Sequence, residues 1–212
     1  VGAAFTAFKD KEYAGKLYDQ LDEFYDAGFY YTNSLSITHR SRATNFLVSF
    51  NNRRESGIIE GNDGYTNRGI RLNVDHRFLE GLDVSVSGFH SSSYRDDLGG
   101  NTLFALTFMP PDVDLRQPNA DGQPYNIYPD PGQSLEENPL YAVHFAQFDQ
   151  KRKRTLGNML LRYAPFKWFD IEGSLSYDRL DQVYSTYYPK GYKTVNATSI
   201  TNVGGVTKST LG

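Results

Sequence analysis

The chain has 212 residues, a formal net charge of -3 and no cysteine, which excludes disulfide scaffolds and thiolate metal sites and gives no reason to expect nucleic acid. No run approaches the roughly 18–20 consecutive apolar residues of a membrane-spanning helix, and the mean hydropathy is -0.56. A barrel strand escapes this test because its lipid-facing and lumen-facing residues alternate. The unusual feature is the aromatic content, 16 Tyr and 14 Phe, which suits strands and the girdles at membrane interfaces.

Residues 1–28 are expected to form a loop that contains a short amphipathic helix. Within residues 9–26, apolar side chains recur at the spacing of one helix face. These side chains are Tyr13, Leu17, Leu21 and the pair Phe24 and Tyr25. The helix would precede the first strand.

Residues 29–53 predict the first hairpin, because apolar and polar side chains alternate on both sides of a turn at residues 40–42. The first strand carries bulky side chains on one face: Phe29, Tyr31, Leu35 and Ile37. The partner strand alternates in the same way over residues 46–51. Residues 54–65 then form a loop.

Residues 66–94 predict the second hairpin, and residues 70–78 contain the clearest pattern of the chain. One face carries Ile70, Leu72, Val74, His76 and Phe78, and the other carries Arg71, Asn73, Asp75 and Arg77. A helix would scatter these nine residues around its circumference, whereas a strand separates them cleanly. A tight turn follows at residues 79–81.

The longest connection is predicted at residues 95–153, which are rich in Pro, Asn, Asp and Gly and include a short helix at residues 101–108. Residues 154–182 predict the third hairpin, with its turn at residues 165–167. Residues 183–212 are expected to form another loop, with a further strand of poorer period.

Short and long connections therefore alternate, which is typical of outer-membrane barrels with short periplasmic turns and long extracellular loops. The predicted fold is all-β: three hairpins of a large transmembrane antiparallel β-barrel, with apolar faces toward lipid and polar faces toward the lumen. About 9–11 residues of each strand would cross the membrane. Six strands are fewer than the roughly eight of the smallest such barrels, so the chain is expected to belong to a longer polypeptide. The alternative is a soluble β-sandwich with long insertions.

Several segments in this order match one known family. Residues 18–29 read YDQLDEFYDAGF, an acidic and aromatic stretch ending in Ala-Gly-Phe, and residues 108–115 read FMPPDVDL. Further matches lie at residues 33–37, 46–50, 57–59, 71–74, 138–141 and 154–158. The order and spacing of these segments resemble the SusC/RagA family of TonB-dependent outer-membrane transporters. Residues 38–42 depart from the family, which usually has Gly-Gly-Ser and an acidic residue there.

The resemblance implies energy-dependent import of oligosaccharides or peptides across the bacterial outer membrane, without covalent chemistry or a cofactor. Substrate would be held between the extracellular loops and a surface lipoprotein lid of the SusD/RagB type. The plug domain and the segment that contacts TonB would lie outside this chain. Aromatic loop side chains are the candidate contacts for substrate or lid, although loop packing explains each of them equally well: Phe104, Phe108, Tyr125, Tyr128 and Tyr141.

No catalytic or metal-binding constellation stands out, because the four histidines are scattered without ligand spacing. The basic run at residues 151–154 is expected to meet lipopolysaccharide phosphates or to form a charged rim. Two other functions stay open. One is a different outer-membrane barrel, such as a siderophore receptor or a secretion channel. The other is a soluble β-rich glycan-binding adhesin, which would not need detergent for extraction.

Overall fold

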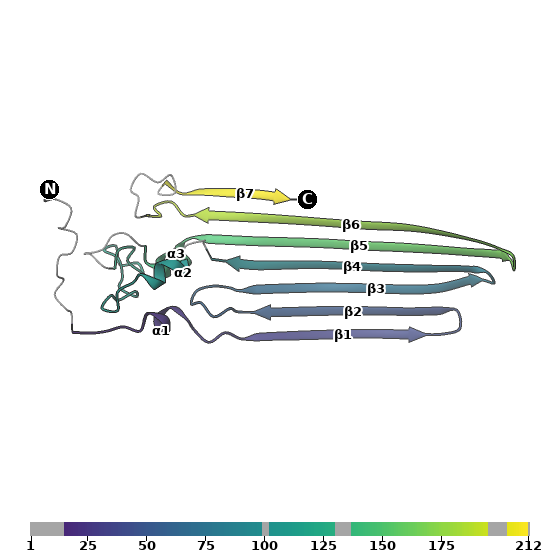
Figure 1. The fold of residues 1–212 in the computed structure, drawn as a ribbon, viewed down its shortest axis with the longest axis horizontal. Coiled ribbons are helices and arrows are strands. Elements are labelled where there is room, and N and C mark those ends of the chain that lie inside the picture. The colour runs from purple at the N-terminus through teal and green to yellow at the C-terminus, as the bar shows by residue number, and fades with distance from the viewer. Residues whose placement is uncertain (1–14, 99–101, 130–136, 195–202, 212) are drawn as a thin grey trace, which may run out of the picture.

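The computed structural model describes residues 15–98, 102–129, 137–194 and 203–211. They form one antiparallel sheet in which each strand pairs with its neighbours in the chain (Figure 1). The strands are β1 Tyr30–Arg40, β2 Thr44–Glu55, β3 Tyr65–Leu79, β4 Leu82–Asp97, β5 Gln147–Phe166, β6 Phe169–Tyr188 and β7 Gly205–Leu211. The helices are α1 Gln20–Phe24, α2 Thr102–Thr107 and α3 Pro139–Phe145. The predicted all-β fold is confirmed.

The two ends of the sheet differ. At one end, here the turn end, two or three residues connect β1 to β2, β3 to β4 and β5 to β6. At the other end, here the loop end, the connections are long, and all three helices gather there (Figure 1). No helix in the described residues is both long and apolar enough to cross a membrane.

The sheet has one apolar and one polar face. Residues paired across an antiparallel ladder point to the same face, so the register defines whole rows of side chains. A row on the apolar face contains His39, Phe46, Val74, Val86, Met159 and Leu175. The adjacent row, on the polar face, contains Thr38, Leu47, Asn73, Ser87, Asn158 and Ser176. The alternation seen within single strands therefore stays in phase from β1 to β6.

The buried core lies in the loops and not in the sheet. Every buried hydrophobic side chain of the described residues belongs to a loop-end segment. On the apolar face of the sheet, by contrast, Leu175 is 71% exposed and Ile37 is 56% exposed. Among the described residues the sheet is a single layer, and none of them covers its apolar face.

The strands are longer than the sequence predicts. β4 continues to Asp97 and β5 already begins at Gln147, so the predicted loop at residues 95–153 is too long at both ends. The outer part of β5 carries polar side chains on both faces, which hides the alternation, yet it pairs fully with β4. β6 likewise continues to Tyr188, past the predicted end at residue 182.

The first helix is shorter than expected. α1 covers five residues and begins after Asp19, whose carboxylate accepts the backbone N–H groups of Leu21 and Asp22. This cap ends the helix on its N-terminal side, so Leu17 lies outside it. Tyr13 lies outside the described residues. α2 falls within the predicted residues 101–108, whereas α3 was not predicted.

Candidate functional site: the loop cap

The loop-end segments fold together into what we call the loop cap, made of residues 15–29, 56–64, 102–129, 137–146 and 189–194. Two hydrophobic clusters hold it. The first contains Phe24, Leu106, Val113, Leu115 and Leu140, and the second contains Ile127, Tyr141, Ala146 and Tyr192. The clusters combine side chains from the segment before β1, the β4–β5 connection and the β6–β7 connection, and Ile59 of the β2–β3 connection packs against the first cluster. These segments therefore form one packed unit at the end of the sheet.

The segment around α1 is tied to two other connections. Its backbone pairs with the β2–β3 connection, since Asp26 N donates to Ile58 O at 2.9 Å and Glu60 N donates to Phe24 O at 3.2 Å. The Gln20 side-chain amide donates to two carbonyls of the long loop, Pro110 O at 2.7 Å and Val113 O at 2.8 Å. α1 therefore bridges the β2–β3 connection and the β4–β5 connection.

Asn138 is the polar centre of the cap. Its side chain is fully buried, and Nδ2 donates to Leu115 O at 2.7 Å and to Asn126 O at 2.9 Å. Oδ1 accepts the backbone N–H of Leu140 at 3.0 Å and so caps α3, where Pro139 occupies the first turn. One amide thus satisfies a buried and a partly buried carbonyl and caps the start of a helix.

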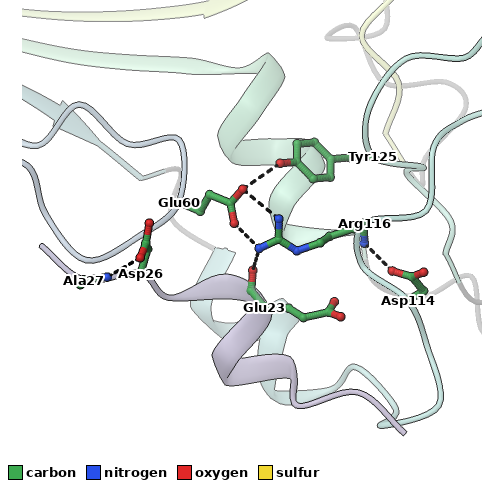
Figure 2. A network of polar contacts seen from close by, with 7 residues as sticks. All are labelled: Glu23, Asp26, Ala27, Glu60, Asp114, Arg116 and Tyr125. Atoms are coloured by element: carbon green, nitrogen blue, oxygen red, sulfur yellow. Dashed lines mark hydrogen bonds and ion pairs between the residues drawn. The ribbon is translucent and has the colours of Figure 1, made fainter. Parts of the chain in front are cut away.

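A polar network lies beside this core (Figure 2). The Arg116 guanidinium donates to Glu60 Oε1 at 3.1 Å, contacts Glu60 Oε2, and donates to the backbone oxygen of Glu23 at 3.1 Å. The Tyr125 hydroxyl reaches Glu60 Oε1 at 3.4 Å. Arg116 therefore joins the long loop to the β2–β3 connection and to α1.

The pKa values of Arg116, Tyr125 and Glu23 are shifted within this network. Hydrogen bonding to the Glu60 carboxylate raises the pKa of Arg116, so this guanidinium stays charged. Burial raises the pKa of the Tyr125 hydroxyl, and the charge of Glu60 adds to the effect. Burial, and next repulsion from Asp114, raises the pKa of Glu23. Glu23 Oε2 is buried and has no hydrogen-bond partner among the described residues.

The structure separates the five predicted contact residues into two groups. Phe104 and Phe108 are 54% and 57% exposed, and their rings lie 4.6 Å apart on the surface of the cap. The three tyrosines pack instead. Tyr141 is only 5% exposed, Tyr128 donates to Thr194 O at 3.0 Å, and Tyr125 packs against both clusters. Contact with substrate or lid stays a prediction, and the exposed phenylalanine pair is its best candidate.

The sequence reasoning missed the residues that organise the cap. Asn138 before a proline carries a recognisable helix-start signal. Arg116 and Glu60 carry no such signal, because nothing local indicates a pair so far apart. Within the described ranges, no group of three His, Asp or Glu side chains could hold a metal ion.

The polar face of the sheet is hollowed below the cap. One shallow hollow of about 450 Å³ is lined by side chains of β3 to β6, among them Arg71, Asn73, Phe89, Asn158 and Asp178. Arg154 forms an ion pair with Asp178 at 2.9 Å beside it. This surface offers water or a polar solute both donors and acceptors.

No known protein-family profile matches the sequence, and no curated protein matches it. Solved structures do match. The RagAB peptide importer in its "closed-closed" state superposes with a TM-score of 0.68 at 16% identity, over 91% of this chain and 22% of the solved one. Another structure, of the RagAB peptide transporter, gives a TM-score of 0.66 at 16% identity, over 84% and 20%.

The likeness is one of fold. It confirms the predicted resemblance to SusC/RagA transporters at the level of the seven-stranded sheet. The chain spans about a fifth of the length of the solved chains that it matches. Both matching proteins are transporters by name.

Proposed function

We propose that this chain is a stretch of barrel wall and surface loops of a TonB-dependent outer-membrane importer of the SusC/RagA type. The observation that carries the proposal is the exposed apolar face, which stays in register across β1 to β6. Soluble monomeric proteins rarely expose a contiguous apolar surface of this kind to water. In a bilayer the apolar face would contact the acyl chains, and the polar face would line the lumen of the barrel.

The same observation disfavours a soluble adhesin. A sandwich would bury its apolar rows against a second sheet, and the described residues contain only one sheet. A siderophore receptor or secretion channel would share the apolar face. The fold likeness to RagAB and the matching segment order favour the SusC/RagA type.

The turn end is proposed to face the periplasm. Phe166 and Trp168 stack there with ring centroids 5.5 Å apart, and Trp168 is 82% exposed. The indole of Trp168 is amphipathic, and such rings lie at the boundary between acyl chains and head groups. The loop cap would then lie outside the cell, where substrate and a SusD/RagB-like lipoprotein lid can reach it.

Peptides are the first substrate class to test, because the two solved structures reported above are named as a peptide importer and a peptide transporter. Oligosaccharides are the second. Phe104 and Phe108 would provide an apolar contact for the lid or the substrate. TonB and the plug would act through other parts of the polypeptide.

The proposal is tested on the full-length protein from its open reading frame. It should require detergent for extraction and show heat-modifiable gel mobility. Phe104→Ser/Phe108→Ser should keep both properties and reduce uptake or lid association, whereas Val203→Ser, which removes an exposed apolar side chain elsewhere at the loop end, should not. Release of the full-length protein without detergent would refute the barrel. Unchanged uptake and lid binding would remove the phenylalanine pair from the site.

A further inference from the structure

Basic side chains follow the apolar rows on the same face of the sheet, toward the loop end. The last row with several apolar side chains contains Leu35, Phe50 and Ile70 on β1 to β3, followed by His90, Thr155 and Arg179 on β4 to β6. The next row contains Asn33, Asn52, Arg68, Ser92, Lys153 and Asp181, and the row after it contains Tyr31, Arg54, Thr66, Tyr94, Lys151 and Val183. We call Arg54, Arg68, Lys151, Lys153 and Arg179 the basic band.

The strand register divides the run of four basic residues on β5. Lys151 and Lys153 point to the apolar face, whereas Arg152 and Arg154 point to the polar face. The polar-face Arg154 is neutralised by Asp178. Alternation thus places two lysines just beyond the apolar rows, where the sequence alone shows only an undivided cluster.

Most of the band has no acidic partner. Arg54, Arg68, Lys151 and Lys153 are exposed, and no carboxylate of the described residues forms an ion pair with them. Lys151 instead lies 5.7 Å from the centre of the Tyr94 ring. Arg179 pairs with Asp181 at 2.9 Å. Five cations and one carboxylate leave a charge of 5 - 1 = +4 in these three rows.

The band is narrow. The following row toward the loop end contains Asp96, Asp149 and Lys208, so its net charge is negative. The three rows of the band span four residues along a strand, about 13 Å. A layer of positive charge of this thickness, between an apolar surface and an acidic one, matches the position of lipid head groups beside acyl chains.

We propose that the basic band binds phosphate groups of outer-leaflet lipid, of the lipid A kind. The proposal rests on the proposed function, because the apolar rows must face acyl chains for the band to lie at head-group depth. Lys and Arg near a membrane surface each contribute attraction to anionic lipid. Within the described residues Arg54, Arg68, Lys151 and Lys153 form no ion pair, so a bound phosphate would not have to displace a carboxylate from them.

The test uses the full-length protein in detergent, titrated with phosphorylated lipid A or with dephosphorylated lipid A. Lys151→Gln/Lys153→Gln should weaken binding of phosphorylated lipid A about 30-fold. The control Arg71→Gln/Arg152→Gln removes the same charge from the polar face and should change binding less than about twofold. Arg54→Gln/Arg68→Gln, on β2 and β3, is a second pair in case the first impairs assembly.

The proposal would be overturned if Lys151→Gln/Lys153→Gln and Arg71→Gln/Arg152→Gln bound phosphorylated lipid A equally well. It would also be overturned if the parent protein bound dephosphorylated lipid A as tightly as the phosphorylated form. Displacement of lipid A by inorganic phosphate at millimolar concentration would overturn its assignment to lipid. The proposed function fails separately, if the full-length protein does not reside in the outer membrane. If the full-length protein resides in the outer membrane and Lys151→Gln/Lys153→Gln binds lipid A like the control variant, the proposed role of the basic band fails and the proposed function stands.

Discussion

Arg116 and Glu60 lie 56 residues apart in the chain and are joined by both oxygens of one carboxylate (Figure 2). The pair links the β4–β5 connection to the β2–β3 connection. Its side chains are half-exposed, so solvent screens the attraction between the charges. The two parallel contacts between the guanidinium and the carboxylate therefore contribute to the stability of the cap mainly by fixing the relative position of the two connections.

Arg116→Ala should therefore loosen the loop cap without affecting the sheet. We expect the free energy of local opening at residues 113–127 to fall by about 1 kcal/mol, measured by hydrogen exchange. Arg77→Ala is the matched control, because Arg77 makes the same fork to Asp83 at the turn end. If both variants speed exchange in the cap equally, the network does not hold the loops.

Asn138→Ala should destabilise the cap more strongly. The substitution removes the Asn138 donor from the buried carbonyl of Leu115 and the partly buried carbonyl of Asn126, and it removes the cap of α3. These losses should cost about 2–4 kcal/mol of local stability. Asn158→Ala is the control, since its amide makes one exposed bond to Ser176. Proteolytic cleavage within the cap reports the effect, and equal resistance of the two variants would contradict it.

The assignment of the faces predicts opposite results at neighbouring positions. Val74→Arg places a charge among the apolar rows and should cost about 2–4 kcal/mol of folding stability in lipid. Asn73→Arg, on the polar face, should cost far less. Cysteines at positions 72 and 73 provide a second readout, because a water-soluble thiol reagent should label only position 73. Equal labelling would refute the assignment.

The cap should also respond to pH through Glu23. Its pKa is raised in the folded cap, so the folded cap binds this proton more tightly than the unfolded chain does. Stability is therefore gained as the pH falls from neutrality through the raised pKa, and is lost when Glu23 ionises.

Glu23→Gln should remove this pH dependence and make the cap at pH 7 at least as stable as in the parent. Hydrogen exchange of cap amides, corrected for intrinsic rates, measures both effects. Asp22→Asn removes a charge from an exposed position of the same helix and should keep the dependence. A parent cap that weakens steadily from pH 7 to pH 5 would show that the sign is wrong.

Gly28 belongs to the motif at residues 18–29 that resembles the SusC/RagA family, and the structure gives a steric reason for a glycine at this position. A Cβ at this position would lie 2.2 Å from the backbone oxygen of Gly57, so Gly28→Ala must separate the two segments. We expect slower assembly or a cap sensitive to protease. Gly88→Ala meets nothing within 4 Å and should behave like the parent. Identical assembly of both variants would remove the steric role of Gly28.

The sequence predicts the strands because apolar and polar side chains alternate strongly in rows such as those of Leu72 and Asn73. It does not predict where β5 begins, because residues 149–153 are polar on both faces and only pairing with β4 extends the strand. The cap is less predictable still. Contacts such as those of Asn138 with Leu115 and of Arg116 with Glu60 join distant segments, and no local pattern encodes them.

The three turns lie on different rows of the ladder. Arg40 pairs with Asn45 beside the first turn, and the register leads from Asn45 to Leu160 on β5. The third turn is flanked by Phe166, six residues further (166 - 160 = 6) and four strand spacings away. Six residues measure about 20 Å along a strand, and four spacings measure roughly 19 Å across the sheet. If all three turns rest at one depth in the bilayer, the strands are inclined by about 45° to the membrane normal, the tilt at which sheets close into barrels.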